Sequence, residues 1–524
     1  MDLKTEIKIT EELISSAKEL REKFWRDPHR PCYHFMPPAA WMNDINGTIF
    51  WKGRYHIFYQ HNPDGAYWKW MQWGHASSID LVHWTHHPIA LTPTLGGADR
   101  DGCFSGGAVV NNFLPPVFRS SLLRKGLNGV PTFIYHGVPE GTCIATSEDD
   151  DLIKWAKHAG NPVIPVPEPD SPDFGKYAVY DPCAWKRGDT YYALCGGLDP
   201  QGGDTAYLFK SPDMIHWEYL NPFYKSDRRW TEVDEDCAVP NFFPIGSKYM
   251  LLFCSHLQGT QYYIGRYEGD QFYPESHARM SWPGGLLGGG ITMLDGKGRR
   301  LFFDWIRGIR GVDAERASGW SGVMTLPRVL SLPDDSILRI EPAPELEILR
   351  YNSRKFENIR LSANSELPLS NVSGDCLEMA LEIEPEDAGE FGLKVRCSPD
   401  GEEQTAVAYS FEEKSLKVYV SKSSLDENIR YYYYRNQGAL DRLPESERIV
   451  KAQKAPFELK AGETLKLRIF LDRSVLEVFA NGRQCITQRI YPTRSDSLRV
   501  VLFSGSGSLK VRSVEAWDMA PAVQ

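Results

Sequence analysis

Short runs of aromatic and β-branched residues, each opening on a glycine, recur along the first two thirds of the chain. Each run is long enough for one β-strand, and residues that favour turns lie between the runs. The intervals are roughly 50 to 75 residues, a period that is typical of propeller repeats. The pattern predicts five blades, each a small antiparallel sheet whose glycine-led run is the inner strand beside a central channel. The five runs are GRYHIFYQ (53–60), GVPTFIYHG (129–137), GDTYYALCGG (188–197), GSKYMLLFC (246–254) and GRRLFFDW (298–305).

A second repeated phrase supports the division into blades. It places an Asp, two aliphatic residues, a polar residue and a Trp in the same order at 80–84, 151–155 and 213–217, each time after a nearby Ser. We expect each copy to close one blade, with its Trp packed between neighbouring sheets. On these repeats alone, an irregular β-sandwich stays open as the alternative.

The two ends of the chain have different patterns. Residues 1–30 show apolar positions at helical spacing and predict a short N-terminal helix. We assign the propeller to 31–340 and a proline-containing linker to 341–356. From 357 to 524, apolar and polar positions alternate, with Asn481-Gly482 as a hairpin turn, which predicts a β-sandwich. The predicted fold class is all-β: a five-bladed β-propeller followed by a C-terminal β-sandwich.

The composition of the chain limits the cellular compartment and the classes of binding partner that we expect. Lys and Arg total 59 against 69 Asp and Glu, and this net charge of −10 argues against nucleic acid or an anionic membrane as main partner. The 10 cysteines show no CxxC pair and no metal-ligand spacing, which favours free thiols in a reducing compartment. No apolar run has membrane-spanning length, and no secretory signal is visible at the N-terminus. We therefore expect a cytoplasmic protein without a metal site.

Three acidic sites stand beside predicted strand ends in the propeller. They are Asp44 in WMNDING, Asp181 in YDP, and the cluster EVDED at 232–236. Taken singly, a turn carboxylate usually caps the backbone. Glycoside cleavage, however, needs one carboxylate to attack the anomeric carbon and one acid to protonate the departing oxygen, and a third carboxylate can stabilise positive charge. Because blades bring distant residues to one end of one channel, the three sites can meet there.

Six sequence blocks carry a resemblance to a known family. WMNDINGTIF at 41–50 resembles the WMNDPNG motif of glycoside hydrolase family 32, the invertase, fructanase and fructosyltransferase family. The resemblance covers nearly the whole chain and keeps the family's order of blocks. It implies a five-bladed propeller with a β-sandwich, no metal or other cofactor, and retention of configuration at fructose C2. The other blocks are FYQHNP (58–63), WGHA (73–76), FSGGAV (104–109), PELEILR (344–350) and IFLDRSVLEVFANGR (469–483).

The resemblance assigns roles residue by residue. Asp44 matches the family's nucleophile and Asp181 its transition-state stabiliser. Tyr180 stands where the family usually has Arg before Asp-Pro, so we expect it to take part in a locally rebuilt fructose subsite. Ile45 replaces the proline of the first block, which should change the rigidity of the turn more than the chemistry. The residues that match positions lining the fructose subsite are Asn43, Gln60, Trp68, Phe104 and Ser105.

The acid/base residue does not follow from the resemblance. Where the family has Glu-Cys-Pro, alignment on Pro240 puts Ala238 at the glutamate position. We assign the role to Glu235, on the view that the strand holds a small insertion. We expect its pKa to be raised, because an acid must be protonated near neutral pH. The residues that stay open as alternatives are Glu232, Asp234 and Asp236.

The predicted activity is hydrolysis of terminal non-reducing β-D-fructofuranosyl units in sucrose or short fructo-oligosaccharides by double displacement. The same fructosyl-enzyme intermediate would serve an exo-fructanase acting on inulin or levan, a fructosyltransferase, or a dianhydride-forming enzyme. A catalytically impaired fructan-binding protein is a further alternative, since the usual Arg and Glu are missing. The fructoside-type blocks disfavour an arabinan- or xylan-active relative. The expected partner is a small β-fructoside, and the chain can be a monomer or a homo-oligomer.

Overall fold

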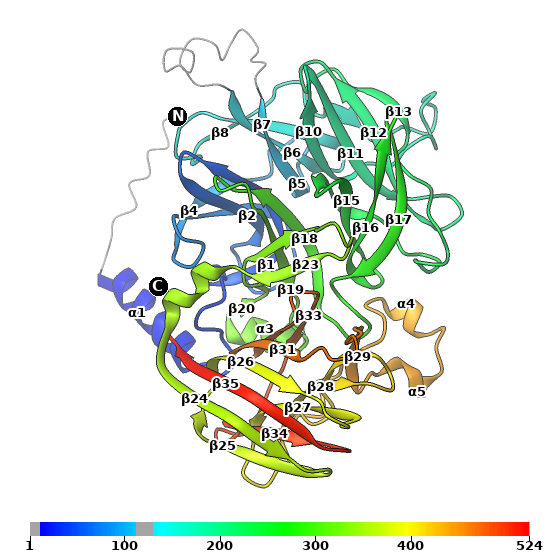
Figure 1. Ribbon diagram of the computed structural model, residues 1–524. Helices are drawn as coiled ribbons and strands as arrows, with labels where there is room; N and C mark the ends of the chain where they lie inside the picture. The colour runs from blue at the N-terminus through cyan, green and yellow to red at the C-terminus, as the bar shows by residue number, and fades with distance from the viewer. Residues whose placement is uncertain (1–10, 112–128, 523–524) are drawn as a thin grey trace.

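The computed structural model describes residues 11–111 and 129–522, and in that part of the chain five sheets are followed by two larger ones (Figure 1). This arrangement confirms the predicted propeller and sandwich. Blade 1 contains β1 (Ala40–Trp51), β2 (Arg54–Asn62), β3 (Gln72–Ser78) and β4 (Trp84–Leu91). Blade 2 contains β5 (Gly102–Asn111), β6 (Val130–Val138), β7 (Gly141–Ser147), β8 (Trp155–Lys157) and β9 (Ile164–Pro165).

The remaining blades follow in chain order. Blade 3 contains β10 (Tyr180–Arg187), β11 (Thr190–Leu198), β12 (Asp204–Ser211) and β13 (Glu218–Pro222). Blade 4 contains β14 (Ala238–Ile245), β15 (Lys248–Ser255), β16 (Gly259–Glu268) and β17 (Gln271–Arg279). Blade 5 contains β18 (Leu287–Leu294), β19 (Arg300–Ile306), β21 (Val323–Met324), β22 (Arg328–Ser331) and β23 (Arg339–Pro342).

The ring is closed by a strand that leaves blade 5. Helix α3 (Val312–Ser318) leads into β20 (Trp320–Ser321), which pairs in parallel with β1 at the start of blade 1. The first blade is therefore completed by residues from the last one.

The first strand of each blade lies innermost. Strands β1, β5, β10, β14 and β18 are the first strands of their blades in chain order, and they contact one another around the ring. The glycine-led runs instead form β2, β6, β11, β15 and β19, so their prediction as inner strands is wrong by one position. These second strands are the most apolar because most of their side chains are buried in the core, whereas the innermost strands carry polar residues.

The repeated Asp-to-Trp phrase forms a tight turn before the fourth strand of its blade. In blade 1, the Asp80 carboxylate accepts hydrogen bonds from the backbone N–H groups of Val82 and His83, at 3.0 and 2.8 Å. Asp213 makes the equivalent bonds in blade 3. In blade 2, Trp155 stacks on Phe133 with ring centroids 3.4 Å apart. The three copies of the phrase therefore close blades 1, 2 and 3, as predicted.

Two six-stranded sheets form the C-terminal domain. One has the order β24 (Arg350–Leu361), β35 (Leu509–Met519), β26 (Cys376–Glu384), β31 (Leu465–Asp472), β32 (Val475–Ala480), β33 (Gln484–Arg489). The other has the order β25 (Ser365–Ser373), β34 (Arg499–Ser504), β27 (Glu390–Cys397), β28 (Thr405–Ser410), β29 (Ser415–Tyr419), β30 (Ala452–Pro456). Asn481 and Gly482 have φ of 48° and 62°, which suits the predicted hairpin between β32 and β33. The connection from the propeller is the short 3-10 helix η2 (Pro344–Leu349), and β24 begins inside the predicted linker.

The two domains share a buried contact rather than a loose hinge. One continuous apolar cluster includes Phe302 of the propeller and Phe479 of the sandwich. Beside it, the Asp472 carboxylate accepts hydrogen bonds from the backbone N–H groups of Cys32, Tyr33 and His34. Because these groups are fully or almost fully buried, the segment that leads into β1 is fixed to the sandwich.

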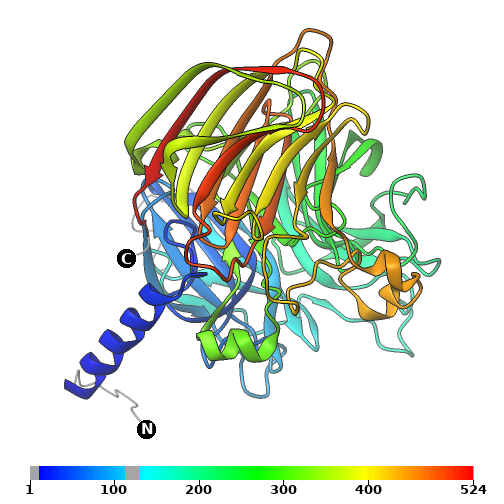
Figure 2. The same cartoon turned by 90° about the horizontal axis from the view of Figure 1, so that it is seen from below.

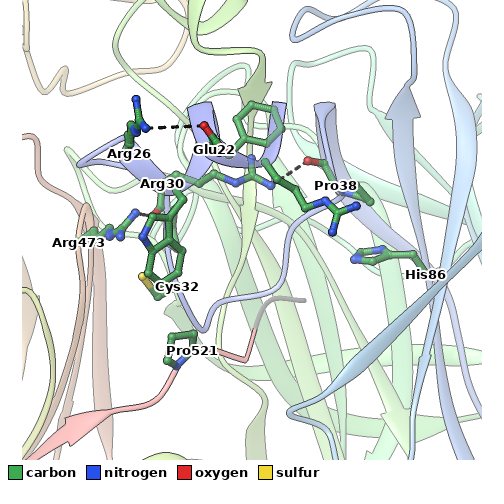
Figure 3. Close-up of a pocket in the computed structure, with 12 residues that line it drawn as sticks. Glu22, Arg26, Arg30, Cys32, Pro38, His86, Arg473 and Pro521 are labelled. Carbon is green, nitrogen blue, oxygen red and sulfur yellow. Dashed lines mark hydrogen bonds and ion pairs between the residues drawn. The ribbon is translucent and has the colours of Figure 1, made fainter. Parts of the chain in front are cut away.

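Helix α1 (Glu11–Arg26) confirms the predicted N-terminal helix and projects from the body of the molecule (Figure 2). A hollow of about 680 Å³ lies where α1 meets the two domains, lined by Arg30, Cys32, His86 and Arg473 among others (Figure 3). It contains neither Asp44 nor Asp181, so it is separate from the predicted site. Among the described residues, no helix has the length and apolar character needed to cross a lipid bilayer.

Candidate active site

Each innermost strand is interrupted by a shift in register. The shifts lie between Met42 and Ile45, Cys103 and Gly106, Tyr180 and Cys183, Ala238 and Asn241, and Gly288 and Ile291. Such a bulge frees residues from the ladder and changes the direction of their side chains. The predicted site residues freed in this way are Asn43, Asp44, Phe104, Ser105 and Asp181. The same kind of register shift therefore frees most of the predicted site residues from the hydrogen-bonded ladder.

Asp44 is held by two neighbouring blades. The Ser105 hydroxyl donates a hydrogen bond of 2.6 Å to Asp44 Oδ2. On the other side lies Gly289 of blade 5, whose φ is 82° and where an added Cβ would overlap the Asp44 carboxylate. Only glycine suits both this backbone conformation and this close approach. The carboxylate therefore has a fixed position between blades 2 and 5.

Asp44 lies close enough to Asp181 to affect the ionisation of the Asp181 carboxyl group. Burial raises the Asp181 pKa to about 7, and the negative charge of Asp44 contributes to this rise. Burial also raises the Asp44 pKa, although hydrogen bonds from Ser105 and Asn43 favour its charged form. Asp181 has a φ of 37°, which is an unusual backbone conformation for a residue other than glycine. This conformation directs the Asp181 side chain away from the regular ladder. The structure thus brings together the first two predicted carboxylates.

Aromatic side chains form a line beside the carboxylates. Trp68 and Tyr180 are 56% and 40% exposed, so each offers a ring face to a ligand. Trp68 meets Phe104 edge to face at 5.7 Å, and Phe104 meets His136 in the same way. His136 in turn stacks on Tyr180. Trp68, Phe104 and Tyr180 therefore belong to one wall, which suits the apolar face of a sugar ring.

Two predicted subsite amides are held in place by hydrogen bonds. The buried Gln60 side chain donates through Nε2 to the Cys103 carbonyl, at 2.9 Å, next to the bulge of β5. Asn43 Oδ1 accepts a 2.7 Å hydrogen bond from Trp41 Nε1. Both contacts fix the orientation of an amide, and the Asn43 amide also donates a hydrogen bond to Asp44. Their roles toward a sugar stay predictions.

Glu235 does not have the environment predicted for a general acid. It is fully buried, and its two carboxylate oxygens accept hydrogen bonds of 2.9 and 2.7 Å from Arg279. Burial alone would raise its pKa, but the bonds and positive charge of Arg279 outweigh burial and lower it. The expectation of a raised Glu235 pKa is therefore wrong, because the sequence did not reveal its partner on β17.

Asp236, one residue further along, lies on the side of the predicted site. Its carboxylate accepts hydrogen bonds from the His256 backbone N–H at 2.8 Å and from His256 Nδ1 at 2.6 Å. The bond to Asp236 raises the His256 pKa to about 9, and the negative charges of Asp236, Asp181 and Asp44 add to this rise. The His256 side chain is 75% exposed, so its Nε2 can reach a ligand. His256 was not singled out in the sequence.

The other two acidic candidates contact the sandwich domain instead. Glu232 accepts a hydrogen bond from Tyr434, and Asp234 pairs with Arg442 at 2.7 Å. The only group in residues 11–111 and 129–522 with metal-like spacing is Cys32, Cys376 and Asp472. It lies between the domains, and its carboxylate already accepts backbone hydrogen bonds, so we assign it a structural role.

Models of two domains of one protein family match nearly the whole chain. The model of the glycosyl hydrolases family 32 N-terminal domain matches residues 34–342, and the model of the family's C-terminal domain matches residues 345–518. The chain belongs to glycoside hydrolase family 32. The family 32 resemblance inferred from six short blocks is thereby confirmed.

Individual relatives match this chain over most of their length. A levanase of Bacillus subtilis is 32% identical, over 97% of this chain and 73% of the levanase. A sucrose-6-phosphate hydrolase of Zymomonas mobilis is 30% identical, over 98% of this chain and 96% of the relative. Among solved structures, fructan 1-exohydrolase IIa from Cichorium intybus has a TM-score of 0.78 at 24% identity, over 95% of this chain and 99% of that one. This structure supports the fold.

The family 32 blocks located the bulged residues but not the groups that complete the site. Gly289 belongs to the run Gly288-Gly289-Gly290, a possible signal of close backbone approach that carried no charge or motif to single it out. His256 lies in the turn after β15, without a motif of its own. Its pairing with Asp236 depends on the hairpin geometry of blade 4, which the order of residues alone does not give.

Proposed function

We propose that the protein is a retaining β-fructofuranosidase that removes terminal β-D-fructofuranosyl units from sucrose or short fructo-oligosaccharides. The observation that carries the proposal is the meeting of Asp44 and Asp181, from two different blades, beside an aromatic wall. Asp44 attacks fructose C2 while the bond from C2 to the departing oxygen breaks, which gives a fructosyl ester. Asp181 holds ring hydroxyls and stabilises the positive charge that develops on the ring.

The names of several relatives support this substrate class. They include a levanase, sucrose-6-phosphate hydrolases and a raffinose invertase of Escherichia coli. Because a levanase and fructan exohydrolases also match, exo-cleavage of a fructan is the second candidate. Transfer of the fructosyl unit to another sugar would use the same ester. No cofactor enters any of these steps.

For the proton donor we favour the Asp236–His256 pair over Glu235. Asp236 holds Nδ1, which leaves His256 Nε2 to give its proton to the departing oxygen as the glycosidic bond breaks. In the second half of the reaction, water attacks C2 and returns a proton to Nε2, and the Asp44 carboxylate is released. A cationic acid is reasonable here because the two neighbouring carboxylates keep the imidazole protonated.

Substitution of His256 by Gln should lower kcat on sucrose by about 100-fold or more, because proton donation to the leaving group is lost. The loss should be much smaller on β-fructofuranosyl fluoride, since fluoride departs without a proton. Glu235→Gln is the matched comparison, and any loss it causes should be equal on both substrates. If Glu235→Gln loses activity selectively on sucrose and His256→Gln does not, Glu235 is the acid.

The proposed activity itself is tested by product analysis. Purified protein incubated with sucrose, 1-kestose, inulin and levan should release free fructose, fastest from the short substrates. In the presence of methanol, a retaining enzyme should also form methyl β-D-fructofuranoside. No product from any of the four substrates, with binding retained, would favour a fructan-binding protein instead.

We also propose that the protein acts in the cytoplasm, as a monomer or a homo-oligomer. All of the cysteines are free thiols and nearly all are buried, which supports a reducing compartment. A small transported fructoside, rather than an external polymer, is the substrate that fits this location.

A further inference from the structure

A segment of the sandwich domain reaches across to the propeller beside the proposed site. It comprises residues 420–451, between β29 and β30, and includes the short helices α4 (Gln437–Leu440) and α5 (Glu445–Arg448). Figure 1 shows α4 and α5 at the lower end of blade 4, near β16 and β17. The ion pair between Arg442 and Asp234 and the hydrogen bond from Tyr434 to Glu232 fix it to the acidic segment before β14.

Arg435 of this segment forms hydrogen bonds to two parts of the propeller. Its backbone N–H donates to the Leu257 carbonyl at 3.1 Å, directly after His256. Its guanidinium donates to the Leu287 carbonyl, at the start of the strand that carries Gly289. Arg435 therefore joins the turn of the proposed acid to the strand that packs against Asp44.

Two glycines make room for the guanidinium. A Cβ added at Gly259 would lie 2.7 Å from one of its terminal nitrogens, and a Cβ added at Gly288 would overlap the other. Any larger residue at either position would have to displace Arg435. The slot is thus shaped for this side chain by β16 and β18.

In the described part of the chain, the Arg435 guanidinium forms no ion pair with a carboxylate, and Asp44 is one of the charges that act on it. The titratable and charged groups around the guanidinium are Cys254, Arg307, Asp304 and Asp44. Among the described residues, Arg435 Nε has no hydrogen-bond partner, and neither has the buried Asp304 Oδ2. A buried cation is costly unless nearby negative charge compensates it. Asp44 and Asp304 are the negative groups in position to do so.

We propose that Arg435 is a positioning residue, supplied by the sandwich, that favours the ionised nucleophile Asp44 and sets its spacing from the His256 turn. This inference rests on the proposed function, because it assigns Arg435 to the reaction of Asp44. It makes the sandwich domain a contributor to the site rather than a separate support. Asp44 is also faced by Asn43, Ser105, Asp181 and His256, and none of these four residues is substituted in the variants below.

The test compares Arg435→Met with Arg442→Met, which breaks an ion pair of the same segment away from Asp44. Without the positive charge the Asp44 pKa rises, so the acid limb of kcat/KM on sucrose should move to higher pH by about one unit. Below that limb, activity should fall about tenfold. Arg442→Met should leave the limb unchanged, and Arg435→Lys, which keeps the charge, should leave it close to that of the wild type.

Gly288→Ala provides a second test that leaves Arg435 in the chain. Its methyl group should push the guanidinium from the slot and move the same limb in the same direction. An acid limb that coincides with the wild type in both Arg435→Met and Gly288→Ala, with folding intact by thermal melting, would overturn the inference. Failure of the proposed function would look different, because the wild-type protein would then release no fructose at any pH.

Discussion

Asp44→Asn should lower kcat on sucrose by about 10⁴-fold or more, since loss of a catalytic nucleophile has effects of this size. An amide cannot form the fructosyl ester, yet it has nearly the shape of the carboxylate and can still accept the hydrogen bond from Ser105. The melting temperature should therefore stay within a few degrees of the wild type. Initial rates of fructose release, measured at several enzyme concentrations, give the comparison.

Ser105→Ala is the control for Asp44→Asn. It keeps the nucleophile and removes only the 2.6 Å hydrogen bond, so a loss of about 10- to 100-fold is expected from the usual strength of a bond to a charged group. If Asp44→Asn retained more activity than Ser105→Ala, Asp44 could not be the nucleophile, and the proposed mechanism would fail.

Asp472→Asn should destabilise the protein by about 3 to 5 kcal/mol, the usual cost of breaking a buried ion pair. The carboxylate accepts a hydrogen bond from His34 Nδ1 at 2.8 Å, in addition to its bonds to the backbone of the same segment. The other ring nitrogen of His34 bonds Glu477, which also pairs with Arg328. Equilibrium unfolding in urea gives the change. Asp335→Asn, at a pair that is partly exposed, should cost less than about 1 kcal/mol.

The effect of Asp472→Asn should depend on pH in a definite way. Burial would raise the Asp472 pKa, but the hydrogen bond and charge of His34 lower it below its ordinary value. Burial would lower the His34 pKa, but the two carboxylates raise it. The carboxylate contribution is complete above the unfolded pKa of about 4 and is lost as pH falls through the folded pKa. The His34 contribution is complete below about 6.5 and is lost as pH rises through the folded pKa. The loss of unfolding free energy in Asp472→Asn should therefore be largest between about pH 4 and about pH 6.5. A loss that is the same from acid to alkaline pH would contradict the role of the Asp472–His34 network.

The sequence predicted the architecture because the repeats report packing directly. Apolar runs such as 53–60 recur wherever a strand is buried between neighbours, and the phrase at 80–84 recurs wherever the same turn closes a blade. The same apolar character placed those runs one position too far inward, since burial on both faces does not distinguish a second strand from a first. The polar positions in β1 and β10, which were interpreted as turns, are the feature that identifies the innermost strands.

The candidate site was predictable where one strand carries its own bulge and not where two elements meet. Asp44 and Asp181 stand in turn-like phrases of the innermost strands, so local sequence was enough. Glu235 and Asp236 are adjacent, and nothing local decides which of them turns toward Arg279 and which toward His256. That choice is made by β15 and β17, whose positions beside the acidic segment follow only from the assembled blade.

The parallel pairing of β20 with β1 has a consequence for the nascent chain. Domains generally form in order of synthesis, yet β1 cannot complete its pairing until Ser321 has left the ribosome. Before then the proposed catalytic residues have all been synthesised, but the strand that carries Asp44 still lacks its pairing with β20. We therefore expect the chain to become active late in its synthesis, after the ring has closed, and we expect a prematurely released fragment to be inactive toward fructosides.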